Sequence, residues 1–140
     1  MTIKTIKGNL FDAPRGFYLA HCISADFALG AGIAVQFNDR YNMRYRLREM
    51  YEHGEVGKAI MVDEVFNLVT KERAHDKPTY DSLRDALWNM RECMQSYAID
   101  KIAMPRIGCG LDRLDWDRVY DIIADTFADL DVEILIYELV

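Results

Sequence analysis

The sequence has few cysteines and no long apolar run. Cys22, Cys93 and Cys109 are odd in number and form no C-x-x-C pair, which argues against a disulfide scaffold or a zinc ribbon. No stretch reaches the roughly 18 apolar residues that a membrane-spanning helix needs, and residues 1–9 lack the apolar centre of a signal peptide. We therefore expect reduced thiols, no membrane association and a cytoplasmic location.

Positive charge is also scarce, because 17 Lys and Arg stand against 23 Asp and Glu, for a net charge of −6. Such a chain has no general attraction to phosphate polymers, so a nucleic-acid partner is open but not favoured. Arg40, Arg44, Arg46 and Arg48 alternate with apolar residues, and we interpret them as a solvated helix face. With 51% hydrophobic residues, residues 1–140 are expected to form one domain, and we expect a monomer.

Short apolar runs alternate with helical patterns along the chain. The expected strands are residues 3–7, 17–21, 59–62, 65–69, 102–104 and 132–140, with a hairpin around Asp63. Apolar residues spaced by three and four predict helices from residue 31, over 42–51, after Thr79 and after Asp115, the last two residues serving as caps. This order predicts a three-layer α/β/α fold with a central mixed, largely parallel sheet. In such sheets, ligands bind beyond the carboxyl ends of the strands.

Two Gly-x-Gly loops each follow an expected strand and precede a helix. They are Gly30-Ala31-Gly32, the first glycine loop, and Gly108-Cys109-Gly110, the second glycine loop. Glycine permits a positive φ and lets backbone N–H groups approach an anion, and a helix N-terminus adds partial positive charge. One isolated loop of this kind more often only forms a turn. Two on the same edge of a sheet favour a site for two phosphates, although neither loop matches a P-loop or a dinucleotide fingerprint.

Five stretches, in order along nearly the whole chain, resemble the macrodomain family, whose fold binds ADP-ribose. More narrowly, they are similar to its branch of terminal ADP-ribose protein glycohydrolases. The stretches are KGNLF (7–11), AHCIS (20–24), GAGIAVQF (30–37), VTKERAHDKPTY (69–80) and MPRIGCGLDRLDW (104–116).

The resemblance implies that the diphosphate lies between the two glycine loops. The family has Asp at the position of Asn9, where it reads the adenine amino group; Asn keeps an acceptor oxygen without the charge, so we expect weaker adenine recognition. Arg106 and Arg113 could donate to phosphate, but we favour a role in fixing their loop. The residues that the resemblance assigns to ADP-ribose are Asn9, Leu10, His21, Cys22, Ser24, Gly30, Ala31, Gly32, Ile33, Ala34, Pro105, Ile107, Gly108, Cys109, Gly110, Leu111 and Tyr137.

The resemblance also implies two catalytic residues. From composition alone, Lys71 is a solvated side chain and Asp112 a helix cap or an arginine partner. By resemblance, the Lys71 amine attacks C1″ of the distal ribose, and Asp112 is the general acid/base. An amine attacks only when deprotonated, which desolvation or cationic neighbours promote. Lys77, Arg73 and Arg106 are the candidate cations.

The predicted function is hydrolysis of ADP-ribose from Glu or Asp side chains, with ADP-ribose and ADP-ribosylated protein as partners. O-acetyl-ADP-ribose and ADP-ribose 1″-phosphate are further candidate substrates. Two alternatives stay open: a reader that binds ADP-ribose without cleaving it, and a DNA ADP-ribosyl glycohydrolase, because an antitoxin branch resembles the same lysine motif. We interpret Cys109 as a small loop residue rather than a reactive thiol. His53 and His75 lack metal-ligand companions at suitable spacing, so we expect no metal, and no cofactor.

Overall fold

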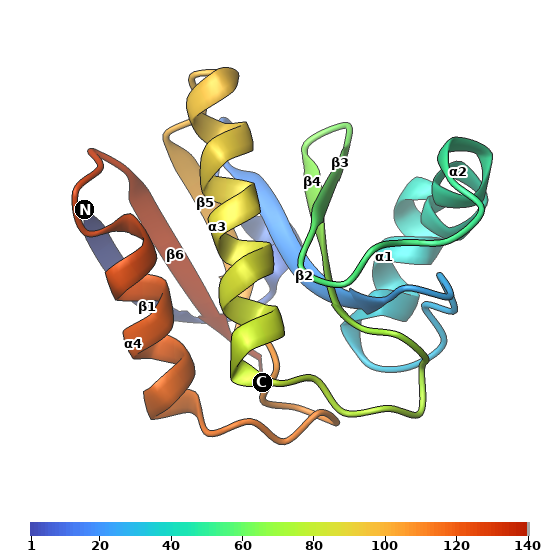
Figure 1. Cartoon of the computed structure of the whole chain (residues 1–140). Coiled ribbons are helices and arrows are strands. Elements are labelled where there is room, and N and C mark those ends of the chain that lie inside the picture. The colour runs from blue at the N-terminus through green and yellow to red at the C-terminus, as the bar shows by residue number, and fades with distance from the viewer. Residues whose placement is uncertain (140) are drawn as a thin grey trace.

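The computed structural model describes residues 1–139, which contain one six-stranded sheet in the order β1-β6-β5-β2-β4-β3 (Figure 1). All neighbouring strands pair in parallel except β3 and β4, which pair antiparallel. The predicted mixed, largely parallel sheet is confirmed. The strands are β1 (Thr2–Lys7), β2 (Tyr18–Ser24), β3 (Ala59–Val62), β4 (Val65–Lys71), β5 (Lys101–Pro105) and β6 (Glu133–Glu138). The helices are α1 (Ile33–Tyr41), α2 (Met43–Met50), α3 (Tyr80–Ser96) and α4 (Trp116–Phe127), with a short 3-10 helix, η1 (Leu10–Asp12).

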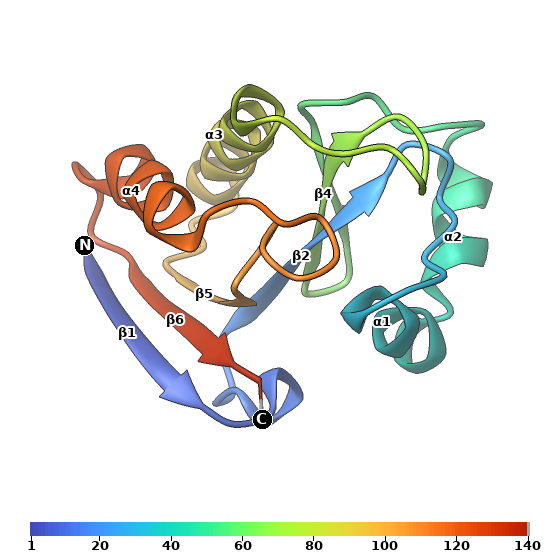
Figure 2. The same ribbon diagram turned by 90° about the horizontal axis from the view of Figure 1, so that it is seen from below.

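Helices cover the two faces of the sheet. Figures 1 and 2 show α3 and α4 on one side, and α1 and α2 on the other. Because side chains alternate along a strand, β4 serves both cores. Phe66 and Leu68 pack in the core under α3 and α4, whereas Val65 and Val69 pack in the core under α1 and α2. This confirms the α/β/α layering.

Two helix starts match the caps expected from the sequence. Thr79 accepts a hydrogen bond from the Ser82 N–H, and the Ser82 hydroxyl accepts one from the Thr79 N–H, so a capping box begins α3. The same hydroxyl donates to the Thr70 carbonyl at 2.7 Å, which ties the start of α3 to the end of β4. Asp115 caps α4 by accepting from the Asp117 N–H.

Other boundaries differ from the expectation. The helix expected from residue 31 begins at Ile33, because Gly32 is its cap in a conformation, φ 61° and ψ −150°, that lies outside the helical region. The strand expected over 17–21 continues to Ser24, and η1 has no counterpart in the sequence analysis. The final strand ends at Glu138, and Val140 lies outside the described residues. Within residues 1–139, no helix is long and apolar enough to cross a membrane.

Candidate functional site

A cavity of about 930 Å³ opens beyond the carboxyl ends of the parallel strands, where Figure 2 shows the connecting loops gathered. Its walls come from four separate parts of the chain: the segment after β2, the segment after β4, the segment after β5 and the end of β6. This is the edge at which α/β sheets bind ligands.

Most of the residues expected to bind ligand line this cavity. Lys71 and Asp112, the residues expected to react, lie in the same wall. The remaining predicted residues in the wall are Cys22, Ser24, Gly30, Ala31, Gly32, Ile33, Ala34, Pro105, Ile107, Gly108, Cys109, Gly110, Leu111 and Tyr137.

Three predicted residues do not line the cavity. Leu10 and His21 are fully buried in the core, and their contact with ligand stays a prediction. His21 Nε2 lies 2.7 Å from the Asn67 side-chain oxygen, and its ring stacks on Phe37 at 3.9 Å. Burial lowers the pKa of His21 to about 4, outweighing the bond to Asn67, which acts to raise it. Asn9 lies outside the wall and accepts from the Phe11 N–H at 2.9 Å, capping η1.

The first glycine loop leads directly into α1. The N–H groups in the first turn of a helix have no intrahelical partners, and the helix dipole makes that end favourable for an anion. Arg44 of α2 holds the approach to this loop, since its Nε and Nη2 donate to the Ala28 carbonyl at 2.8 and 2.6 Å.

The interpretation of the arginine series as a solvated helix face is therefore wrong for Arg44, which is half-buried and bound to backbone. Arg46 forms an ion pair with Asp63 at 2.7 Å on the surface. The Arg40 guanidinium lies 4.1 Å from the centre of the Phe11 ring. None of the four arginines, Arg48 included, lines the cavity, so the series does not contribute to its wall.

The second glycine loop forms a closed turn rather than a helix start. Gly108 has a φ of +74°, and the Leu114 N–H donates to the Gly108 carbonyl at 2.8 Å. The helix α4 begins at Trp116, after the expected cap Asp115, so five residues separate its first turn from Gly110. Burial raises the pKa of Cys109 to about 11, so its thiol stays protonated at neutral pH.

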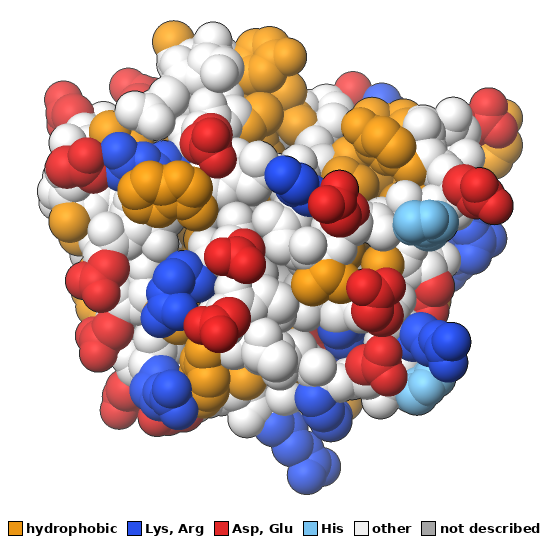
Figure 3. Space-filling model, viewed as in Figure 1, with side chains coloured by type: hydrophobic (Ala, Val, Ile, Leu, Met, Phe, Trp, Pro, Cys, Tyr) orange, Lys and Arg blue, Asp and Glu red, His pale blue; other side chains and the backbone are white. Residues whose placement is uncertain are grey.

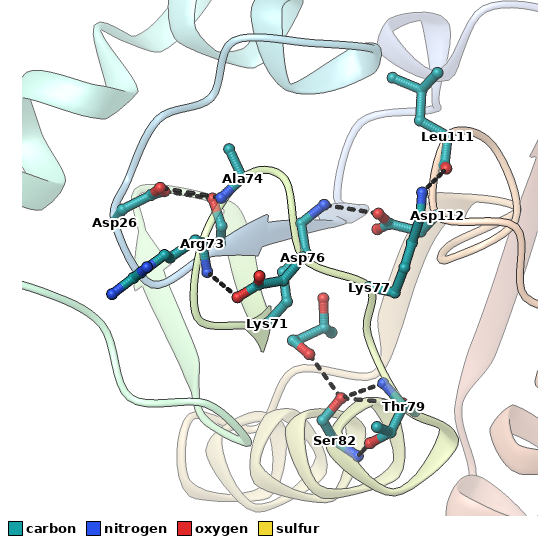
Figure 4. A network of polar contacts seen from close by, with 12 residues as sticks. Asp26, Lys71, Arg73, Ala74, Asp76, Lys77, Thr79, Ser82, Leu111 and Asp112 are labelled. Atoms are coloured by element: carbon teal, nitrogen blue, oxygen red, sulfur yellow. Dashed lines mark hydrogen bonds and ion pairs between the residues drawn. The ribbon is translucent and has the colours of Figure 1, made fainter.

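Lys71 and Asp112 meet across the cavity although 41 residues separate them in sequence. Lys71 is the last residue of β4, and its Nζ donates to Asp112 Oδ1 at 2.7 Å (Figure 4). Their side chains are 14% and 16% exposed, so this ion pair is shielded from water but remains reachable from the cavity. An amine and a carboxylate in contact can exchange a proton and can act on the same bound group.

The three cations expected around Lys71 have different partners. Lys77 Nζ donates to the carbonyl of Leu111, next to Asp112, at 2.9 Å. The Arg73 side chain extends away from Asp112 in Figure 4. Arg106 pairs with Glu138 at 3.2 Å, in agreement with a role in fixing its loop.

Asp26 organises part of the site, a role that we did not predict from the sequence. Its Oδ1 accepts from the Ser24 hydroxyl at 2.5 Å and the Ala28 N–H at 3.1 Å, and its Oδ2 accepts from the Ala74 N–H at 3.0 Å. Burial acts to raise the pKa of Asp26, but the bonds from Ser24, Ala74 and Ala28 outweigh it and hold the pKa below its ordinary value. The only sequence signal was an Asp two residues after a serine at a strand end, a common turn pattern.

The face of the molecule drawn in Figure 3 has no broad patch of basic side chains that would bind an anionic polymer. On the face in Figure 3, acidic and basic side chains are interspersed, and cations gather towards the lower edge, where the loops after the strands lie. Among residues 1–139, no group of three or more His, Cys, Asp or Glu side chains could hold a metal ion.

Comparison with known sequences identifies relatives of this chain. A family model described as the macro domain matches residues 21–123. The chain is 40% identical over 141 residues to the ADP-ribose glycohydrolase OARD1 of Homo sapiens, covering 98% of this chain and 91% of that protein. It is 30% identical over 133 residues to the DNA ADP-ribosyl glycohydrolase of Mycobacterium tuberculosis, covering 85% of this chain and 37% of that protein.

Solved structures share the fold. The macrodomain of Mycobacterium tuberculosis DarG superposes with a TM-score of 0.89 at 25% identity, covering 98% of this chain and 97% of that one. Thermosipho africanus DarTG in complex with ADP-ribose superposes with a TM-score of 0.80 at 17% identity, covering 99% of this chain and 42% of that one. At that lower identity the likeness supports the fold alone.

Proposed function

Because the chain belongs to the macrodomain family, we propose that it binds ADP-ribose in the cavity beyond β2, β4 and β5 and hydrolyses it from the acidic side chains of proteins. The observation that carries the proposal is the contact between Lys71 and Asp112 inside that cavity. A relative that is 40% identical over nearly the whole chain is named an ADP-ribose glycohydrolase, which supports the same class of reaction.

The diphosphate is proposed to lie between the two glycine loops. The N-terminus of α1 and the backbone N–H groups of Gly30–Gly32 attract it from one side. The Gly108 and Gly110 N–H groups attract it from the other side, since the Ile107 and Cys109 N–H groups donate to the Pro105 and Arg106 carbonyls. Tyr137 at the end of β6 lines the remaining part of the cavity and is proposed to contact the base.

The distal ribose is proposed to reach the Lys71–Asp112 pair. A proton moves from Lys71 Nζ to Asp112 Oδ1, which leaves a neutral amine and a carboxylic acid. The amine electron pair forms a bond to C1″ while the bond from C1″ to the acyl oxygen breaks, and Asp112 returns the proton to that oxygen. The glutamate or aspartate side chain leaves as its free acid. Water then supplies hydroxide to C1″, and its proton goes to the Lys71 amine as the C1″–N bond breaks.

A second candidate is removal of ADP-ribose from DNA. The 30% identity to a DNA ADP-ribosyl glycohydrolase favours it, although the chain covers only 37% of that protein. The net charge of −6 weakens the general attraction to nucleic acid that such a substrate uses. Hydrolysis of the acetyl ester in O-acetyl-ADP-ribose is proposed as a side activity.

The test is a panel of ADP-ribosyl-Glu, ADP-ribosyl-Ser and ADP-ribosyl-thymidine substrates. The wild type should release ADP-ribose from the glutamate ester. Lys71→Ala should lower kcat by about 10³-fold or more, since acid–base and covalent help of this kind contribute about 10²–10⁴-fold. ADP-ribose affinity, measured by calorimetry, should change by less than about threefold.

The matched control is Arg73→Ala, which removes a cation from the same segment whose side chain points away from Asp112. It should keep wild-type turnover. Full activity in Lys71→Ala would refute the covalent mechanism. A wild type that binds ADP-ribose but cleaves none of the three substrates would instead identify a reader, and cleavage of the thymidine substrate alone would identify the DNA enzyme.

A further inference from the structure

We propose that Asp26 is a positioning residue that fixes the segment carrying Lys71 against the first glycine loop and directs the Ser24 oxygen into the cavity. This inference rests on the proposed function, since it explains how the two parts of that site keep their spacing. Asp26 itself does not line the cavity. Its effect is therefore exerted through the groups that it binds.

The backbone around Asp26 explains why a tie is needed. β2 and β4 pair in parallel up to Ser24 and Lys71, with a register shift after Ile23, and the Ala25 N–H donates to the Lys71 carbonyl at 2.8 Å. Beyond Ser24 and Lys71 the β2–β4 pairing ends, and the two segments that follow these strands run separately. Within residues 1–139, the bond from the Ala74 N–H to Asp26 Oδ2 continues the link, as Figure 4 shows.

The other carboxylate oxygen acts on the opposite segment. Asp26 Oδ1 accepts from the Ala28 N–H, two residues before the first glycine loop, and from the Ser24 hydroxyl. One carboxylate thus joins the Lys71 segment to the approach of the first glycine loop. Hydrogen bonds to an ionised acceptor are about twice as strong as neutral ones, which suits a tie between two irregular segments.

The direction of the Ser24 hydroxyl follows from the same contact. Ser24 is 5% exposed and lies in the cavity wall. A hydroxyl has one proton, and that proton is donated to Asp26, so the oxygen offers lone pairs alone to the cavity. Ser24 can therefore accept a hydrogen bond from a ligand hydroxyl, such as one on the distal ribose.

An amide cannot replace this carboxylate. Asp26→Asn has one oxygen and one NH₂ group, whereas three donors approach its two positions. If the oxygen faces Ser24 and Ala28, the NH₂ faces the Ala74 N–H. If the oxygen faces Ala74, the NH₂ faces the Ala28 N–H. Each arrangement sets a donor against a donor and loosens one of the two segments.

The experiment compares Asp26→Asn with Asp76→Asn. Asp76 lies in the same segment as Ala74, and its carboxylate accepts the Arg73 N–H at 3.1 Å, so its contact stays within that segment. An amide rotated to present its oxygen retains that bond. In Asp26→Asn we expect kcat to fall about 10- to 100-fold, because small misplacements of reacting groups cost about this much. KM and ADP-ribose affinity should change less than about threefold. Asp76→Asn should match the wild type.

A second measurement does not depend on turnover. Amide hydrogen exchange at either Ala74 or Ala28 should speed up about tenfold or more in Asp26→Asn, with the amides of β6 unchanged, because one of the two bonds that protect them is lost. Unchanged exchange at both Ala74 and Ala28, or equal kcat in the two variants, would overturn the inference. If the wild type hydrolyses none of the substrates, the proposed function fails, while the exchange result still decides whether Asp26 ties the two segments.

Discussion

The two glycine loops face each other across the cavity but are built differently. Gly30-Ala31-Gly32 runs straight into α1 and is held from behind by Arg44. Gly108-Cys109-Gly110 closes on itself through Leu114 and is followed by Asp112, which contacts Lys71. Leu111 reaches across, and a Cβ on Gly32 would lie 3.9 Å from its Cδ1. The first loop is thus suited to attract an anion. The second loop lies between the expected anion position and the Lys71–Asp112 pair, so it connects the two parts of the site.

The two glycines of each loop differ in backbone conformation. Substitutions at these glycines should have the largest effects on ligand affinity and stability. Gly32 and Gly108 have positive φ, whereas Gly30 and Gly110 do not. Gly32→Ala should lower ADP-ribose affinity at least about tenfold, because a side chain in its conformation costs about 1–3 kcal/mol. Gly108→Ala should also lower the free energy of unfolding, because its Cβ would lie 2.9 Å from Leu114 Cδ1. Calorimetric titration and urea unfolding measure the two effects.

Gly30→Ala and Gly110→Ala are the matched controls, since an added Cβ meets no atom closer than 3.9 Å at either position. Both should keep wild-type stability. If Gly110→Ala destabilises the protein as much as Gly108→Ala, backbone conformation is not what distinguishes these glycines.

Acid should lower the free energy of unfolding through His21, which stacks on Phe37 of α1 below the first glycine loop. Burial lowers the pKa of His21 to about 4 in the folded protein, from an ordinary value of 6.5. The unfolded chain therefore binds the proton more tightly, so stability is complete above about pH 6.5 and falls as the pH drops towards 4. Between pH 7 and pH 5 this one residue should cost about 2 kcal/mol of unfolding free energy.

Urea unfolding of the wild type and His21→Gln at both pH values measures the His21 contribution. The loss between pH 7 and pH 5 should be about 2 kcal/mol smaller in His21→Gln. His75→Gln removes a histidine whose side chain is 77% exposed, and its loss of unfolding free energy between pH 7 and pH 5 should equal that of the wild type. An equal loss in His21→Gln and the wild type would place the acid-sensitive group elsewhere.

The smallest effects concern the side chains that hold the loops from outside. Arg44→Lys keeps the charge but loses the planar fork that grips the Ala28 carbonyl, so it should cost about 1 kcal/mol of unfolding free energy. Lys77→Met removes an exposed bond to the Leu111 carbonyl and should change stability by less than about 0.5 kcal/mol. Thermal unfolding compares the two. A larger loss of unfolding free energy in Lys77→Met than in Arg44→Lys would show that the second loop depends more on a side chain from another segment than the first loop does.

Local signals in the sequence predicted much of this fold. The spacing of Leu83, Leu87 and Met90 and the caps at Thr79 and Asp115 depend on neighbouring residues alone, and they were confirmed. The hairpin at Asp63 likewise needs only two short runs and a turn, and it accounts for the one antiparallel pair among the described strands.

Contacts between residues far apart in the sequence could not be predicted from local patterns. Nothing near β1 indicates that it pairs with β6, more than a hundred residues later. The meeting of Lys71 with Asp112 followed from resemblance and not from spacing, and the core position of His21 depends on Phe37 and Asn67 from other elements. Arg44 was misjudged for the same reason, since its partner is a carbonyl in another loop.

The ion pair between Lys71 and Asp112 has a further consequence for the protein at rest. A sheltered amine that is hydrogen-bonded to a carboxylate is a poor target for the free aldehydes and sugars that modify surface lysines. The contact with Asp112 thus protects the amine that the proposed reaction needs.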